Sequence, residues 1–250
     1  MRALIAILLT GGLVAAGSTV AATGAQPPTQ RAATAQSPSQ TKVEIDVKVS
    51  PNKAGTKRKP RGVRVKATTT LKTPPQFEPP ILQRARIYLS KYGLYNGAKY
   101  PKCSKSRLNR KGPGGCPKGS IMGKATGDAF ADTVITHPRI TIVNGGANRV
   151  YFYTVLNNPA RVQTAVEGKI TKLRGNPKYG YRLDFTVPQV LQVVAGVPIQ
   201  VTRITGSAGR KDWLANTGCP RDRLWRGEGV GYFDNGGNSG VINASTPCRP

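Results

Sequence analysis

The sequence predicts an all-β protein, an antiparallel β-sandwich of the Ig-like or jelly-roll-like kind. Short apolar segments that alternate with polar residues recur along the chain, and this period of two is typical of half-buried strands. Turn-forming residues separate them, with 29 Gly and 20 Pro in 250 residues. Strands do not alternate with long helical patterns, so we expect antiparallel pairing, disulfide-stapled loops and at most short helical turns.

The first strands are expected over 43–50 and 63–71. Apolar residues occupy every second position of the first segment, and the basic stretch 53–61 joins it to the second. Four prolines within 73–80 interrupt pairing, because proline has no N–H to donate to a strand ladder. A third strand begins near Ala85.

The middle of the chain predicts a small cysteine-closed loop followed by an unusual strand. Ser104 is a suitable N-cap for a short helical turn, which glycine and proline after Lys111 would end. Beyond it, Gly123, Ala125 and Gly127 fall on one face of a strand, as expected where another backbone approaches closely.

Two hairpins are predicted in the second half. The first runs from 139 to 156 and turns at 144–148, where Asn-Gly tolerates a positive φ. The second runs from 162 to 187. After a helical turn and a further strand, the glycine-rich tail is expected to pair across 234–238.

The amino terminus is typical of a secretory signal peptide. Arg2 precedes an uncharged apolar stretch that ends at Gly17, and small residues follow where a signal peptidase would cleave. A membrane anchor is the alternative, but the apolar run is shorter than the roughly 20 residues that a spanning helix needs. We therefore expect a signal peptide over 1–25, no transmembrane segment in the mature chain, and a secreted, extracellular protein that could associate with the cell wall.

The rest of the chain divides into a tether and a domain. Residues 26–42 are rich in Pro, Ser, Thr and Gln and have too few large apolar groups to offset their ordering entropy. We expect one β-sandwich domain over 43–250. A division near 127–137 is the alternative.

Four cysteines would meet an oxidising environment after export. An even number predicts two disulfides, although four cysteines allow three connectivities. Proximity in sequence favours Cys103–Cys116 and Cys219–Cys248. The spacing includes no CxxC, so neither a zinc knuckle nor redox catalysis is indicated, and we expect no metal site.

The charge balance predicts an anionic partner. The chain has 38 Lys and Arg against 11 Asp and Glu, a formal net charge of +27. A field of this sign attracts an anionic cell-wall polymer or another polyanion, or it serves only as a solvated surface. Nine basic residues in two clusters are the candidate contacts: Lys57, Arg58, Lys59, Arg61, Lys102, Lys105, Arg107, Arg110 and Lys111.

The residues give little support for catalysis. His137 is the single histidine and precedes a proline, and no GxSxG motif is present, so a Ser-His-Asp arrangement is not indicated. Asp128 and Asp132 are the candidate pair for a glycan hydrolase, but two residues four apart on a strand are separated by roughly 13 Å, farther than either mechanism requires. We expect no enzyme activity and no cofactor.

Several short motifs resemble a group of exported actinobacterial β-rich proteins that have no assigned activity. They are Cys103, Leu108, Cys116-Pro117, Ser120–Ala125, Tyr179–Leu183 and Val187-Pro188. The resemblance covers about 43–204 and implies a secreted β-rich domain, with no functional residue to carry over. It does not cover the Cys219–Cys248 tail.

Together these features predict a secreted, non-catalytic, cationic β-sandwich that associates with anionic cell-envelope polymers. A wall-directed glycan hydrolase and an extracellular nucleic-acid-binding protein are the alternatives. Nucleic acid is the less expected partner outside the cell.

Overall fold

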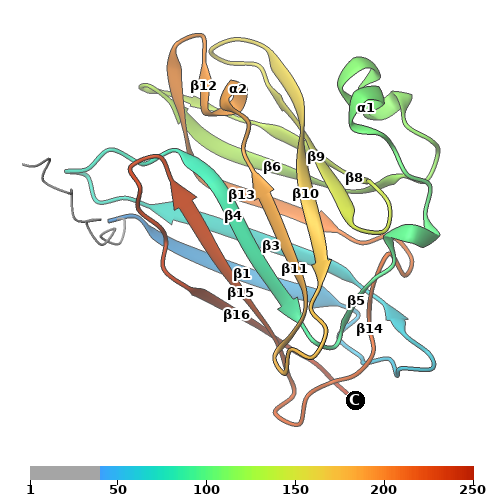
Figure 1. The fold of residues 1–250 in the computed structure, drawn as a ribbon. Coiled ribbons are helices and arrows are strands. Elements are labelled where there is room, and N and C mark those ends of the chain that lie inside the picture. The colour runs from blue at the N-terminus through green and yellow to red at the C-terminus, as the bar shows by residue number, and fades with distance from the viewer. Residues whose placement is uncertain (1–39) are drawn as a thin grey trace, which may run out of the picture. The chain divides into compact units, whose positions relative to one another are not determined.

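The computed structural model describes residues 40–250, whose strands form one large antiparallel sheet and one small sheet (Figure 1). The predicted signal peptide and most of the predicted tether lie outside the described residues. The main path of the large sheet, in spatial order, is β1 (Lys42–Ser50), β3 (Arg64–Lys72), β13 (Val197–Ala208), β6 (Ile121–Ala131), β8 (Arg139–Asn144), β9 (Arg149–Leu156), β10 (Val162–Lys172), β11 (Tyr179–Thr186), β4 (Leu82–Ser90), β15 (Leu224–Phe233) and β16 (Ile242–Pro247).

The remaining elements are short. β7 (Val134–Thr136) pairs with β6, and β12 (Val193–Val194) pairs with β13. The small sheet has the order β2 (Arg61–Gly62), β14 (Leu214–Asn216) and β5 (Gly93–Tyr95). The helical segments are η1 (Gly97–Lys99), α1 (Lys105–Lys111), η2 (Pro113–Gly115) and α2 (Gln189–Gln192). The predicted antiparallel all-β fold with short helices is therefore confirmed.

The predicted strand pairs are present. β1 and β3 pair antiparallel across the basic connection, and β8 with β9 and β10 with β11 form the two central hairpins. β15 and β16 pair across the glycine-rich turn. In the first central hairpin the positive φ lies at Gly146, which has φ 109°, and Asn144 instead ends strand β8.

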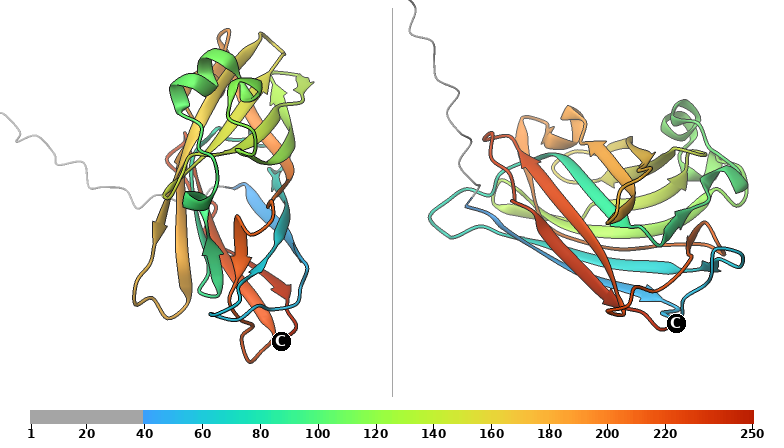
Figure 2. Two further views of the ribbon diagram at one scale, coloured as in Figure 1. Left: turned by 90° about the vertical axis from the view of Figure 1, so that its right-hand side faces the viewer. Right: turned by 60° about the horizontal axis from the view of Figure 1, so that its bottom comes forward.

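The large sheet curls until its two edge strands lie beside one another, which gives a nearly closed barrel or sandwich (Figures 1 and 2). Ten antiparallel steps separate β1 from β16, so the two edges run in the same direction. No ladder joins them within the described residues. One parallel bridge at their carboxyl ends, between Lys53 and Arg249, holds this seam, with an Ala54 N to Arg249 O distance of 2.6 Å.

Both predicted disulfides are present and secure loops outside the barrel wall. Cys103–Cys116 closes the segment that contains α1, where the Ser104 side chain accepts a hydrogen bond from the Arg107 N–H as the expected N-cap. Leu108 of this helix is fully buried on the outer face of β8, β9 and β10. Cys219–Cys248 ties the chain end to the segment before β15.

Candidate ligand-binding cavity

Strand register decides which side chains face the inside of the barrel. Across five neighbouring strands, one row of paired positions contains Val47, Ala67, Gly206, Ala125 and Ile140. All five line a single internal cavity. Because side chains alternate across a strand, the charged residues between them face outward.

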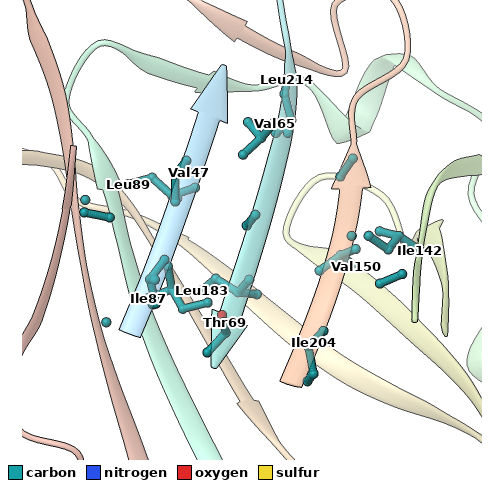
Figure 3. Close-up of a pocket in the computed structure, with 18 of the residues that line it drawn as sticks. Val47, Val65, Thr69, Ile87, Leu89, Ile142, Val150, Leu183, Ile204 and Leu214 are labelled. Atoms are coloured by element: carbon teal, nitrogen blue, oxygen red, sulfur yellow. The ribbon is translucent and has the colours of Figure 1, made fainter. Parts of the chain in front are cut away.

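The opposite wall is built in the same way. Its row of paired positions contains Ile170, Leu183, Ile87, Gly229 and Ile242, which belong to β10, β11, β4, β15 and β16. Figure 3 shows side chains from both walls directed toward the space between them. The interior is therefore lined mainly by aliphatic groups.

Small residues keep this interior from filling. On β15, Gly227, Gly229 and Gly231 occupy alternate positions between the buried Trp225 and Phe233, so the middle of this strand contributes no side-chain volume to the interior. A Cβ on Gly229 would have no neighbour closer than 3.8 Å. At Gly229 the missing side chain therefore leaves open space, whereas a Cβ on Gly227 would lie 3.0 Å from the Tyr88 carbonyl oxygen.

Close backbone approach explains the other small residues, as predicted for β6. A Cβ on Gly123 would lie 2.1 Å from the carbonyl oxygen of Ser207, and a Cβ on Gly206 would lie 2.4 Å from the Ala125 Cβ. Larger side chains at these glycines would force β6 and β13 apart.

The resulting cavity has a volume of about 560 Å³ and overwhelmingly apolar walls (Figure 3). Inward-facing Ile45, Val47 and Val49 of β1 are only half-buried, because part of their surface borders this space. Ordinary protein cores are close-packed and leave few voids larger than a water molecule. The volume falls within the range of roughly 300–1,000 Å³ that small-molecule sites occupy.

A buried polar group fixes the wall at one end of the barrel. Asn144 is fully buried, and its Nδ2 donates to the carbonyl oxygen of Gly97 at 2.9 Å. Its Oδ1 accepts from Trp213 Nε1 at 3.1 Å and lies 3.2 Å from the Tyr95 hydroxyl. Burial raises the pKa of Tyr95, so this phenol stays protonated. The network joins the end of β8 to β5 and to Trp213, the residue before the central strand β14 of the small sheet.

The small sheet covers this end of the cavity. Val63, Trp213 and Ala215 are buried there and line the interior. Asn216 is also buried, and its Oδ1 accepts from the Gly55 N–H at 2.6 Å. Its Nδ2 has no hydrogen-bond partner among the described residues.

The nine predicted polyanion contacts are all exposed but fall into two separate places. Residues 57–61 lie on the connection from β1 to the small sheet. The others lie on the first disulfide loop, just before α1 or on it, and α1 packs on the outer face of β9 and β10. The structure does not bring the two groups together on one strand or loop.

The two aspartates considered for hydrolysis are in different settings, and Asp184 is a further acidic residue that stands between two arginines. Asp128 Oδ1 lies 2.9 Å from His137 Nδ1 on an exposed part of β6, and Asp132 follows the strand with φ 56°. The two aspartates therefore do not share a strand. Asp184 contacts Arg86 at 2.7 Å and Arg182 at 2.6 Å. Within residues 40–250, no cluster of three or more His, Cys, Asp or Glu side chains could hold a metal ion.

Sequence reasoning did not find the cavity. Its signal was present in the alternating glycines 227, 229 and 231, which place no side chain on one face of a strand. Glycines at alternate strand positions are also typical of places where two backbones pack closely. Only the distances around each glycine in the structure distinguish close packing from an open cavity.

The fold and the cavity define the protein as a nearly closed antiparallel barrel with an apolar interior. No family model matches the chain, and neither the curated proteins nor the solved structures provide a match. The resemblance to exported actinobacterial proteins therefore stays a prediction. Among residues 40–250, no helix is long and apolar enough to cross a membrane.

Proposed function

We propose that the protein binds a small apolar molecule inside its barrel. The single observation that supports this is the cavity of about 560 Å³ between two aliphatic walls. An engineered apolar cavity of about 150 Å³ already stays dry and binds benzene. A space several times larger, with the same kind of lining, favours an occupant of greater size, such as a hydrocarbon chain or a fused-ring lipid.

The wall geometry supports a ligand role over a loosely packed core. A larger residue on β15 would occupy part of the space, and Gly229 has room for a Cβ. Glycine in a strand interior lowers stability. Two such residues, Gly227 and Gly229, line the cavity and therefore favour a retained binding volume.

An uncharged dye tests this proposal. N-phenyl-1-naphthylamine should bind saturably with about one molecule per chain, and its fluorescence should rise because it leaves water. An uncharged probe is required, since a +27 chain attracts anionic dyes through its surface. Extraction of the purified protein with organic solvent, followed by mass spectrometry, should recover a co-purifying lipid. A linear, non-saturating dye signal would contradict the proposal.

A second candidate function is association with anionic cell-envelope polymers, and the distribution of charge favours it. The segments that connect strands at the small-sheet end are 51–63, 91–120, 145–148, 173–178, 209–223 and 248–250. They hold 20 Lys and Arg against two Asp. A surface with this excess attracts polyanions, and the attraction weakens as salt screens it.

Secretion to the cell envelope is part of this second proposal. The apolar amino terminus and the two disulfides support it, because disulfides persist in oxidising compartments. Competition between purified wall polymer and DNA for the protein distinguishes an envelope ligand from nucleic acid. If DNA displaces the protein from wall polymer as well as free wall polymer does, the cationic surface is nonspecific.

A further inference from the structure

Large hydrophobic side chains are exposed at the end of the barrel opposite the small sheet. Among residues 40–250, six large hydrophobic side chains are classed as exposed, and five of them lie on segments that connect strands at this distal end. These five, which we call the apolar rim, are Phe77, Val134, Ile135, Val190 and Val241, with between 46% and 62% of their surface exposed. The sixth, Ile121, begins β6 at the small-sheet end.

Hydrogen bonds join two of the rim segments directly. The Ile81 N–H donates to Asp234 Oδ1 at 2.9 Å, and the Asp234 N–H donates to the Ile81 carbonyl at 3.1 Å. These reciprocal bonds hold the segment of Phe77 beside the segment of Val241.

The other rim residues follow along the same edge. The Val187 N–H donates to the Gln83 carbonyl at 2.7 Å, which places the segment carrying Val190 next to the start of β4. From there β12, β13, β6 and β7 are paired in succession, and β7 carries Val134 and Ile135. Hydrogen bonds and strand pairing therefore connect the four rim-bearing segments along one edge of the barrel.

The rim is also nearly free of positive charge. The connecting segments at this end are 73–81, 132–138, 157–161, 187–196 and 234–241. They hold one Arg and three acidic residues, whereas those at the small-sheet end hold 20 Lys and Arg. Although the chain has a net charge of +27, its distal end can contact an apolar partner without removing many cations from water.

Prolines restrict the backbone around one rim residue, Phe77. The Phe77 N–H donates to the Pro74 carbonyl at 3.0 Å in a turn, and prolines flank this turn on both sides. Because each proline fixes its own φ, less backbone conformational entropy remains to be lost when Phe77 is buried against a partner.

We propose that the apolar rim inserts into the surface of a lipid bilayer and so places the distal end of the barrel against a membrane. Apolar patches of this kind mark interaction sites. The cavity next to the rim has the apolar chemistry of a bilayer interior, and Leu82, Val187 and Leu191 from rim-bearing segments or their borders also line it. The inference goes beyond ligand binding and can be tested without any ligand.

A lipid surface fits better than a second copy of the chain. A stable protein interface buries about 800 Å² per partner with complementary shape, whereas the rim consists of separate projections from four segments. Two chains of +27 also repel one another. A fluid bilayer accepts side chains at different heights and has no such charge.

Vesicles of pure phosphatidylcholine test the proposal, because they have no net charge for the basic end to recognise. The protein should co-sediment with them at physiological salt, and binding should change little when the salt is raised. Replacing Val134 and Ile135 together by Ser should weaken partitioning about tenfold or more, since two half-exposed aliphatic groups no longer enter the lipid. Phe77→Ser with Val241→Ser should do the same from another part of the rim.

Ile121→Ser is the matched control, because it removes an exposed aliphatic group from the other end and should leave vesicle binding unchanged. Urea unfolding of each variant shows whether the fold persists. Absence of vesicle binding by the unaltered protein, or equal loss with Ile121→Ser, would overturn the inference. So would rim-dependent dimerisation in light scattering without vesicle binding. Rim variants should retain dye binding, so failure of the cavity proposal and failure of this one are distinguishable.

Discussion

Ile45 on edge strand β1 reaches toward Gly229 on β15, and its Cδ1 lies 3.8 Å from the position a Cβ on Gly229 would occupy. Strand β16 pairs with β15 and borders β1, so this contact spans the seam of the barrel from the inside. It identifies Gly229 as a position where a Cβ makes only ordinary contacts, since the nearest backbone atom, the Arg86 carbonyl oxygen, is also 3.8 Å away.

Gly229→Leu is therefore expected to reduce apolar-dye affinity about tenfold or more while the protein stays folded, because the new side chain occupies the ligand volume. Dye titration and urea unfolding measure the two effects. Gly114→Leu is the control, since Gly114 is exposed and has open space around its Cβ position. Equal dye affinity in all three proteins would show that the ligand does not occupy this cavity.

Asn144→Ala should lower the free energy of unfolding by about 3 kcal/mol, because it leaves the buried Trp213 N–H without its acceptor and removes the hydrogen bonds to the carbonyl groups of Gly97, Tyr100 and Pro101. Urea denaturation with an unchanged m-value would give the difference. Asn148→Ala in the same turn is the comparison, since the Asn148 side chain is exposed and its carbonyl still accepts from Ile170. Equal stability of the two variants would contradict the role assigned to Asn144.

Replacing Cys219 and Cys248 by Ser should lower stability by about 3–4 kcal/mol and speed dye exchange. The Cys219–Cys248 disulfide fixes the last residues of the chain. Among these residues, Arg249 forms the β-bridge to Lys53 after β1, and this β-bridge joins the two edges of the seam. Stopped-flow dye release measures the exchange rate. The protein with Cys103→Ser and Cys116→Ser should also lose stability, but its dye release should stay as slow as in the unaltered protein, because the Cys103–Cys116 disulfide lies away from the seam.

Asp184 predicts a pH dependence of stability. Its partial burial acts to raise the pKa, but hydrogen bonds from Arg86 and Arg182 outweigh this and hold the pKa of the carboxyl below its ordinary value. A depressed pKa contributes stability that is present above the unfolded-state value and lost as the pH falls through the folded-state value.

Asp184→Asn should therefore cost about 1–2 kcal/mol at pH 7 and progressively less as the pH drops below about 4 toward the depressed pKa of the folded protein, below which the wild-type carboxyl is also neutral. Urea midpoints measured from pH 7 to pH 2 provide the comparison. A stability difference that stays constant over this range would exclude the ion pairs as its source.

Lys57→Gln with Lys59→Gln should weaken binding to anionic wall polymer and reduce its dependence on salt, because both side chains are exposed in the basic connection. Arg161→Gln with Arg203→Gln removes the same charge from exposed positions elsewhere on the barrel. Binding measured over a range of salt concentrations compares the pairs. Equal effects would mean that total charge, and not the basic end, attracts the polymer.

Local patterns correctly predicted much of the fold. Alternating apolar residues identified β1 and β3, and turn residues identified the two central hairpins, because these elements depend on neighbours in sequence. The disulfides followed from proximity, since each joins cysteines separated by short segments. The helical turn at Ser104 followed from its capping side chain.

The sequence by itself determined the strands, their hairpin partners and the excess of positive charge. Only the tertiary structure decided that the sheet curls until β1 lies beside β16. It also decided that Asn144 ends β8 and accepts a hydrogen bond from Trp213, and that Gly227 and Gly229 of β15 line a cavity. These features depend on contacts between residues tens of positions apart or more. A pattern of period two states which side of a strand is apolar, but the volume enclosed depends on how all the strands come together.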